Sequence, residues 1–417
     1  MYFGPIGKNS EILTSYFERN GSHPCPPDAN PVEWMLGVIG AAPGASTDKD
    51  WPVAWDNSPE KAAVKAELAQ MEAELSVKPR NIDPNAGLEF AVPFSQQFAV
   101  CLKRIFQQYW RTPTYIWAKC FLCTASALFV GLTFFMASNS LQGLQNQMFA
   151  IFMLLPIYGN LSFQMMPHFV TQRSLYEVRE RPSKAYSWKA FMLSNIIVEF
   201  SWQTLMTVMP FVSWYYPIGL YRNTEATGTL HERGALMFLL LWAFYVWIST
   251  FSHLLVAGME SAETASNVGQ LLFSLCLVFC GVLASPDVLP RFWIFLYWSS
   301  PFTYLVSAMM SVGVAGTDVV CSSIEILRFQ PTEGRTCGDF MANYTAFAGG
   351  KVLNPLATEN CEFCAITNTD TFLTAIKSHY VDRWRNFGFL MVFVAFNIVG
   401  ALFLYWFARV PKKSKRN

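Results

Sequence analysis

Six long apolar stretches restrict this chain more than any other feature of its sequence. They lie near residues 114–136, 146–168, 188–214, 235–257, 266–284 and 387–408. A bilayer core of about 30 Å needs about 20 largely apolar residues in one helix, so each stretch predicts a span. Charged residues make up only 14% of the chain, against about 25% in soluble domains. The sequence therefore predicts an all-α membrane protein with six transmembrane helices.

A seventh apolar stretch, at 291–310, is interrupted by Pro301. Basic residues of short loops stay on the cytosolic side; here they precede the first span, lie in loop 169–187 and follow the last span. Both termini are then cytosolic and the number of spans is even. We therefore predict a re-entrant hairpin at 291–310 and an extracellular loop at 315–385, in a multi-pass protein of the plasma membrane.

The extracellular loop carries four of the ten cysteines, Cys321, Cys337, Cys361 and Cys364. In an oxidising compartment this grouping predicts two disulfides. Cys361 and Cys364 are then expected to belong to different bridges instead of forming a redox or zinc pair. Asn343 begins a glycosylation sequon on the same side of the membrane, whereas the sequons at Asn20 and Asn160 fall in cytosol and membrane.

Two charged residues lie within predicted spans. An intramembrane carboxylate such as Glu199 is costly and normally faces a partner or a watery cavity. A structural hydrogen bond between helices and a role in transport explain it equally well. Lys119 lies near the end of the first span, where a long side chain can snorkel to the interface.

Aromatic residues of the second and fifth spans are candidates to line a path for flat, greasy compounds. The candidates are Phe149, Phe152, Met153, Phe273, Ser274 and Phe279. The alternative is that such side chains only face lipid or neighbouring helices. The sequence offers no paired catalytic carboxylates, no nucleophilic triad and no cluster of metal ligands. We therefore expect no enzyme site and no metal. A net charge of +1 also argues against nucleic acid as a partner.

The segments outside the spans suggest how the chain is organised. Residues 1–45 are soluble in character, 46–93 form a linker with one charged helix, and 94–112 form an amphipathic interfacial helix. Residues 113–314 hold the first five spans and the hairpin, and 386–417 hold the last span and a basic tail. The stretch YEVRERPSKAYSW, between spans two and three, contains the coupling-loop candidates Tyr176, Glu177, Arg179, Glu180 and Arg181. Positive-inside topology alone explains its charge, but a docking element for a soluble motor is the sharper hypothesis.

The opening GPIGKNS resembles a phosphate-binding loop but does not satisfy its pattern. That loop requires G-x-x-x-x-G-K-[ST] after a strand, whereas only two residues separate Gly4 from Gly7, and Asn9 replaces the hydroxyl residue. We expect a turn that leads into a helix.

Several motifs resemble one protein family along essentially the whole chain. They are YFGPIG, NPVEWML, QYWRTPTYIWAK, YEVRERPSKAYSW, FCGVLASPDVLPRFWIFLYWSSPFTYLV and CEFC…YVDRWRNFG. Together they resemble the fungal pleiotropic drug resistance transporters, which are G-type ABC exporters. The chain looks like the end of the second motor domain followed by the second membrane domain.

The resemblance implies a role in ATP-driven export of hydrophobic drugs or secondary metabolites. Residues 1–45 would be a remnant of the nucleotide-binding domain, a strand-turn-helix that follows its nucleotide motifs. The chain has no Walker A, signature, Walker B or switch histidine, so ATP and Mg²⁺ are implied only for motor domains elsewhere. The expected partners are membrane lipid, a hydrophobic cargo and a motor-bearing half or another G-type half-transporter. The alternative is a truncated, non-transporting relic that associates with full-length exporters.

Four cysteines allow three disulfide connectivities. We favour the nested pairing, Cys321–Cys364 with Cys337–Cys361, without excluding the other two.

Overall fold

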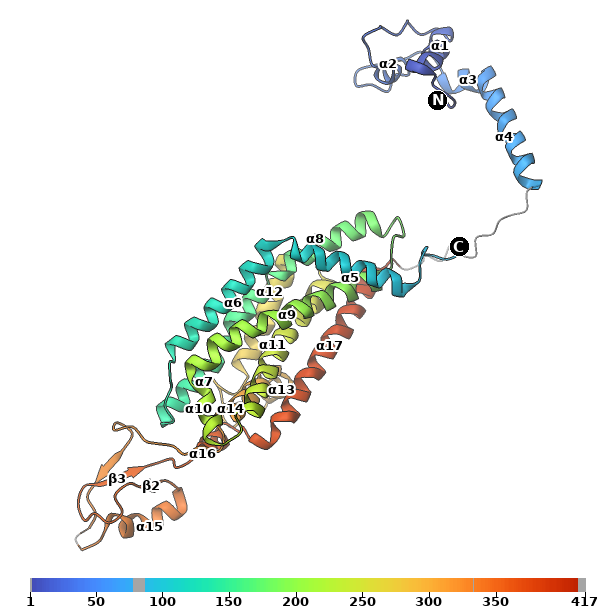
Figure 1. Ribbon diagram of the computed structural model, residues 1–417. Coiled ribbons are helices and arrows are strands. Elements are labelled where there is room, and N and C mark those ends of the chain that lie inside the picture. The colour runs from blue at the N-terminus through green and yellow to red at the C-terminus, as the bar shows by residue number, and fades with distance from the viewer. Residues whose placement is uncertain (1, 78–86, 333, 412–417) are drawn as a thin grey trace. The chain divides into compact units, whose positions relative to one another are not determined.

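The computed structural model describes residues 2–77, 87–332 and 334–411 (Figure 1). The chain divides into two compact units, 1–87 and 88–417. Each unit is described by itself.

The first unit is a small helical body. It contains the 3₁₀ turn η1 (Lys8–Ser10) and the helices α1 (Glu11–Arg19), α2 (Pro31–Val38), α3 (Trp51–Asp56) and α4 (Pro59–Val77). The rings of Phe17 and Trp51 pack 5.0 Å apart in its core. Residues 2–7 form no strand. The expected turn and helix are therefore present after Gly7, but the strand of the expected strand-turn-helix is not.

The second unit is a helical bundle with a cysteine-rich subdomain at one end (Figure 1). Its helices up to the subdomain are α5 (Phe94–Trp110), α6 (Pro113–Thr133), α7 (Leu141–Ser162), α8 (Met165–Leu175), α9 (Trp188–Ile218), α10 (Leu220–Ala226), α11 (Leu230–Gly258), α12 (Ala262–Val278), α13 (Ile294–Ser299) and α14 (Pro301–Val314). The π-helical turn η2 (Tyr176–Glu180) continues α8, and α17 (Arg383–Arg409) returns from the subdomain along the bundle.

Four helices of the described residues are long and apolar enough to cross a membrane. They cover Pro113–Thr133, Trp188–Ile218, Leu230–Gly258 and Tyr380–Arg409. The other two predicted spans are helical but depart from the expectation. Stretch 146–168 is divided between α7 and α8, and α12 has only 17 residues. The structure therefore supports a membrane-spanning bundle, while six spans stay a prediction.

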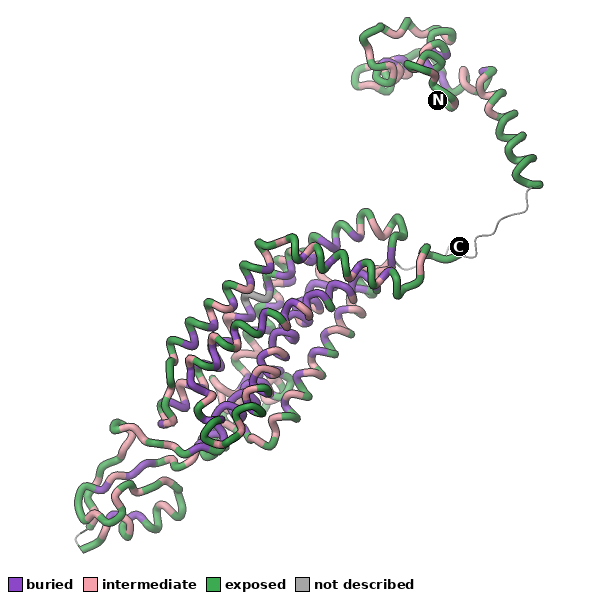
Figure 2. Tube along the Cα trace, viewed as in Figure 1, coloured by how far each residue is buried: buried purple, intermediate pink, exposed green. Residues whose placement is uncertain are grey.

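The core of the bundle lies around α11, which packs against α7, α8, α9, α12, α14 and α17. Buried residues occur on all faces of α11, from Arg233 to Ala257, and Figure 2 shows them along the middle of the bundle. A helix that is apolar all round belongs in the centre of such an assembly. The elements that surround α11 are thereby held in one body.

Residues 291–310, predicted as a re-entrant hairpin, form two helices that meet at Pro301. The ring of Pro301 cannot continue the preceding helix but suits the first position of the next one. The Ser300 side chain accepts a hydrogen bond from the Phe302 amide and caps α14. The break is therefore encoded locally, while the re-entrant path stays a prediction.

The cysteine-rich subdomain contains a small antiparallel sheet in the order β1-β3-β2. Its elements are β1 (Leu327–Phe329), α15 (Cys337–Ala348), β2 (Lys351–Val352), β3 (Cys361–Cys364) and α16 (Thr369–Ala375), with the 3₁₀ turn η3 (Tyr380–Asp382) before α17. In the register of the sheet, Phe329 faces Cys361 and Lys351 faces Cys364. The central strand β3 thus carries both Cys361, which is paired with β1, and Cys364, which is paired with β2.

Candidate functional site

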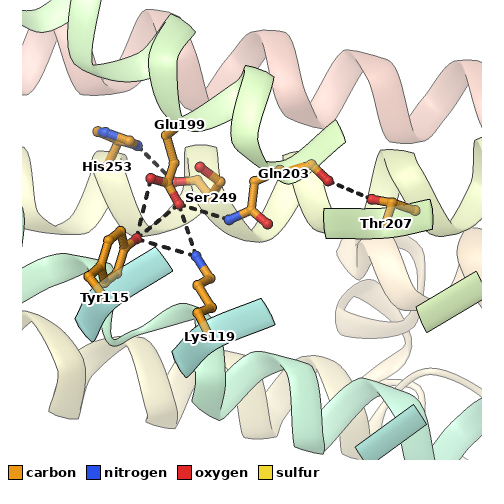
Figure 3. Close-up of polar contacts among 7 residues, drawn as sticks. All are labelled: Tyr115, Lys119, Glu199, Gln203, Thr207, Ser249 and His253. Atoms are coloured by element: carbon orange, nitrogen blue, oxygen red, sulfur yellow. Dashed lines mark hydrogen bonds and ion pairs between the residues drawn. The ribbon is translucent and has the colours of Figure 1, made fainter. Parts of the chain in front are cut away.

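The centre of the bundle holds a buried ion pair between α6 and α9. Nζ of Lys119 lies 2.9 Å from Oε1 of Glu199, and each side chain is 1% exposed. The Tyr115 hydroxyl donates to the same carboxylate at 3.1 Å, and Nε2 of Gln203 donates to it at 2.8 Å. Figure 3 shows these donors converging on Glu199 from both helices. The carboxylate is thereby paired and hydrogen-bonded, which is the condition for keeping a charge inside a bundle.

A third helix, α11, lies beside the ion pair and its hydrogen-bond donors. Nδ1 of His253, on α11, donates to the Ser249 carbonyl at 3.0 Å (Figure 3). Within the described part of the chain, neither Nε2 of His253 nor Oε1 of Gln203 has a hydrogen-bond partner. The Thr207 hydroxyl extends the polar row along α9 by donating to the Gln203 carbonyl at 2.7 Å. The polar centre is defined here as Tyr115, Lys119, Glu199, Gln203 and His253.

The interpretation of Lys119 as a snorkelling residue is wrong. Lys119 lies on the face of α6 that also buries Ile116 and Cys123, and its ammonium group ends on Glu199 instead of reaching the interface. The sequence alone does not indicate this pair, because Lys119 and Glu199 are 80 residues apart along the chain. The geometry favours a structural lock between α6 and α9, and a direct role of Glu199 in transport stays a prediction.

The predicted coupling loop, residues 176–188, forms a second polar site. Glu180 accepts hydrogen bonds from Nη1 and Nη2 of Arg104 at 2.6 and 3.1 Å, and from the Tyr186 hydroxyl. Burial by itself raises the pKa of the Glu180 carboxyl, but the hydrogen bonds from Arg104 and Tyr186 outweigh it and lower the pKa. The bidentate pair ties the amphipathic helix α5 to segment 176–188.

The remaining coupling-loop candidates have separate surroundings. Tyr176 is buried, and its hydroxyl donates to the Tyr186 carbonyl at 3.2 Å. Glu177 and Arg181 contact the end of α17, as described below, whereas Arg179 is exposed. A π-helical turn is rare and often marks a functional site. Here the charged residues of the turn contact two different helices: Glu180 contacts α5, and Glu177 contacts α17.

Gln97 is a residue of this region that the sequence did not indicate. A glutamine of an amphipathic helix is expected on its polar, exposed face, yet Gln97 is buried. Its Oε1 accepts from the Ser187 amide at 2.9 Å, and its Nε2 donates to the Val92 carbonyl at 2.7 Å. A glutamine on a polar helix face carries no sequence signal for such a contact, so only the packing of α5 on α9 reveals it.

The structure does not gather the six substrate-path candidates on one surface. Phe152 and Phe273 are buried, whereas Phe149 and Met153 are exposed on α7 and Ser274 is exposed on α12. Phe273 packs against Phe302 with ring centroids 4.9 Å apart, and a Cβ at Gly159 would lie 2.3 Å from its ring. Phe279 stacks on Trp293 at 5.8 Å. Phe273 therefore joins α7, α12 and α14, while the exposed members face outward.

The cysteine-rich subdomain is held by two disulfides, Cys321–Cys364 and Cys337–Cys361. Two bridges were predicted, and the observed connectivity is the nested one. Asn343 is exposed on α15.

Glu325 links the subdomain to the bundle by accepting hydrogen bonds from the Gln142 and Leu141 amides at 2.8 and 3.3 Å and from the Ser322 amide at 2.9 Å. It thereby caps the N-terminus of α7.

These features define a helical membrane domain whose segment 176–188 is tied to α5 and α17. The chain belongs to the ABC-2 type transporter family, whose membrane-domain model matches residues 96–313, more than half of the chain.

The chain is similar over practically its whole length to multidrug transporters of three fungi. It is 60% identical to ABC multidrug transporter C of Aspergillus fumigatus over 99% of its length, and 57% identical to ABC multidrug transporter atrG of Aspergillus oryzae over 100%. It is also 54% identical to ABC multidrug transporter MDR3 of Trichophyton rubrum over 99% of its length. The chain spans about 28% of the length of each of these relatives. The resemblance to fungal drug transporters is therefore confirmed.

Proposed function

We propose that this chain is the membrane-spanning half of an ATP-driven exporter of hydrophobic drugs or secondary metabolites. The observation that carries the proposal is its identity of 54–60% with the three fungal multidrug transporters over practically its whole length. The chain lacks ATPase motifs of its own, so ATP and Mg²⁺ act on motor domains that it does not contain. A motor-bearing N-terminal half or another G-type half-transporter is the partner.

Segment 176–188 is the site where the motor acts in this proposal. Two exposed apolar side chains, Leu175 immediately before the segment and Val178 within it, lie near the exposed Arg179. Such a mixed surface suits a contact with a soluble domain. The bidentate Arg104–Glu180 pair then carries displacement of the segment to α5, which leads directly into α6.

The exposed faces of α7 and α12 are where the second half packs and the cargo passes. Asn267 and Ser274 are both exposed on α12, two helical turns apart on one face. Polar side chains of a membrane helix rarely face lipid and normally turn to protein or a watery cavity. The exposed Phe149 and Met153 of α7 supply apolar surface for a hydrophobic cargo. In this arrangement α7 and α12 complete the set of six spans.

The cysteine-rich subdomain covers the exit on the extracellular side, with both chain termini in the cytosol of a plasma-membrane protein. A cavity of about 560 Å³ lies where this subdomain meets the bundle, lined by Asn139, Arg222, Asn223 and Asp318 among others. These polar side chains lie among apolar ones such as Met136 and Val320, and such a mixed lining suits release of an apolar compound toward water. Asn343 carries a glycan in this topology.

Drug accumulation in cells tests the proposal. The chain is expressed with a motor-bearing half, and retention of a fluorescent hydrophobic drug is compared with cells that hold either half alone. Lower retention only with both halves is the expected result. The variant R104A should abolish most of this effect, and K103A, which alters an exposed neighbour on the same helix, should not. Co-purification of the halves without any change in retention would instead identify a non-transporting modulator.

A further inference from the structure

Two arginines from different elements close the C-terminal end of α11. Arg173, in the last turn of α8, donates from Nη1 to the Val256 carbonyl at 2.6 Å and from Nη2 to the Glu260 carbonyl at 2.6 Å. Arg409, the last residue of α17, donates from Nη2 to the Met259 carbonyl at 2.7 Å. The last carbonyls of a helix lack intrahelical partners, and cations are favoured beside them. Arg173 is only 3% exposed, so its side chain is enclosed by the elements that it joins.

Segment 176–188 also contacts α17 directly. Nη1 of Arg181 donates to the Arg409 carbonyl at 2.7 Å. The Tyr405 hydroxyl donates to Oε1 of Glu177 at 3.1 Å, and Nη1 of Arg409 lies 3.8 Å from Oε2 of the same carboxylate. We call Arg173, Arg181 and Arg409, with these acceptors, the arginine clasp. It joins segment 176–188 to the ends of two helices that follow it far along the chain.

The helices α11 and α17 are tied together at further points. Near the middle, Nδ2 of Asn397 donates to the Thr250 hydroxyl at 3.3 Å. At the opposite end, Nη2 of Arg383 lies 3.2 Å from Oε1 of Glu232. Nη1 of Arg233 also donates to the Ala315 carbonyl, at the start of the cysteine-rich subdomain, at 2.8 Å. The two helices therefore form a braced pair that extends from the clasp to the subdomain.

We propose that the arginine clasp makes segment 176–188 and the C-terminal ends of α11 and α17 move as one body. This inference rests on the proposed function and deepens it, because it identifies positioning residues that send motor work along the braced pair toward the exit. Chains of packed side chains, hydrogen bonds and rigid helices carry coupling over such a distance, and the clasp supplies such contacts. The positive-inside rule explains why the residues are basic, but any cation satisfies that rule. The two-pronged contact of Arg173 requires a guanidinium.

Distance measurement between two spin labels tests the clasp without requiring export. Labels are placed at Ser183 and Ala408, which are both exposed, in the chain assembled with its motor-bearing partner. The half-exposed Cys25, Cys120 and Cys276 are replaced by serine. We expect one narrow distance distribution that is the same with and without ATP. R181Q should broaden it at least two-fold, and R173K should broaden it although the charge is kept.

K103Q is the matched control, because Lys103 is an exposed basic residue on α5 that belongs neither to the clasp nor to segment 176–188, and it should leave the distribution unchanged. Transport per ATP hydrolysed, measured on the same samples, should fall several-fold in R181Q and R173K but not in K103Q. A wild-type distance that changes with ATP, or equal widths in wild type and both clasp variants, would overturn the clasp. Failure of export in the wild-type assembly would instead overturn the proposed function and leave the distance result standing.

Discussion

Lys119 on α6 and Glu199 on α9 form an ion pair with 2.9 Å between Nζ and Oε1, and neither side chain reaches the surface. Removal of one partner leaves the other charge uncompensated in the interior, whereas replacement of both leaves none. Substitution of these two residues therefore tests how strongly the ion pair stabilises the packing of α6 on α9.

The first prediction follows from that relationship. K119M and E199Q should each destabilise the bundle by about 3–5 kcal/mol, and the double variant K119M/E199Q should recover much of the loss. Thermal unfolding in detergent, arranged as a double-mutant cycle, measures the coupling. Lys103, an exposed lysine on α5, supplies the control K103M. Additive single effects would show that the two residues do not depend on each other.

The second prediction concerns Arg104 and Glu180. Because Glu180 has a lowered pKa, its contribution to stability is present above about pH 4.5 and is lost as the pH falls through the lowered value. Arg104 is partly exposed, so solvent screening reduces the pair to about 1 kcal/mol or less. R104A should therefore barely change thermal stability while it reduces export strongly. Equal losses in stability and export would assign the pair a purely structural role.

The third prediction concerns the two disulfides. Their sequence separations of 43 and 24 residues correspond to about 3–4 kcal/mol each in the loop-entropy model. Non-reducing peptide mapping should recover Cys321 with Cys364 and Cys337 with Cys361. C337S/C361S should unfold the subdomain at a lower temperature than wild type, with the helical signal of the bundle retained. Four free thiols in protein from the cell surface would contradict the assignment.

The fourth prediction concerns Glu325 and acidity. Burial favours a higher pKa for this carboxyl, but hydrogen bonds from the Gln142, Ser322 and Leu141 amides dominate and lower it. The stabilising contact is therefore complete near neutral pH and is lost as the pH falls below about 4.5 toward the lowered value. E325Q should cost about 1–2 kcal/mol at pH 7 and less at pH 3. A pH-independent difference in melting temperature would argue against the cap.

The fifth prediction concerns Asn343. Its sequon lies on an exposed face of α15, and Phe347, one helical turn further on, is 94% exposed. A glycan at Asn343 would cover part of that ring, which otherwise faces water. Treatment with an N-glycosidase should increase the mobility of the wild-type protein on a gel and leave N343Q unchanged. Identical mobility before and after treatment of wild type would place this sequon out of reach of glycosylation.

Several site residues were identified from the sequence, but their partners were not. Glu199 stood out because a carboxylate inside an apolar stretch is conspicuous by itself. Its partner Lys119 was misinterpreted, because distance to the end of a span does not say which face of the helix a residue occupies. The aromatic path candidates show the same limit. Phe149, Phe152 and Met153 lie within little more than one turn of α7, and only tertiary packing decides that Phe152 is buried and the other two are exposed.

Elements defined by a short window of sequence were predicted well. Four apolar stretches are helices fit to cross a bilayer, Pro301 breaks the segment at 291–310, and four cysteines form two bridges. These outcomes depend on hydropathy, ring geometry or redox setting, which can be judged from the residue types of a single segment. Contacts of Lys119, Gln97 and Arg173 depended instead on which helices pack together. Tertiary structure decided them, since a buried polar group takes the nearest partner in space, and that partner lies 80 to 90 residues away along the chain.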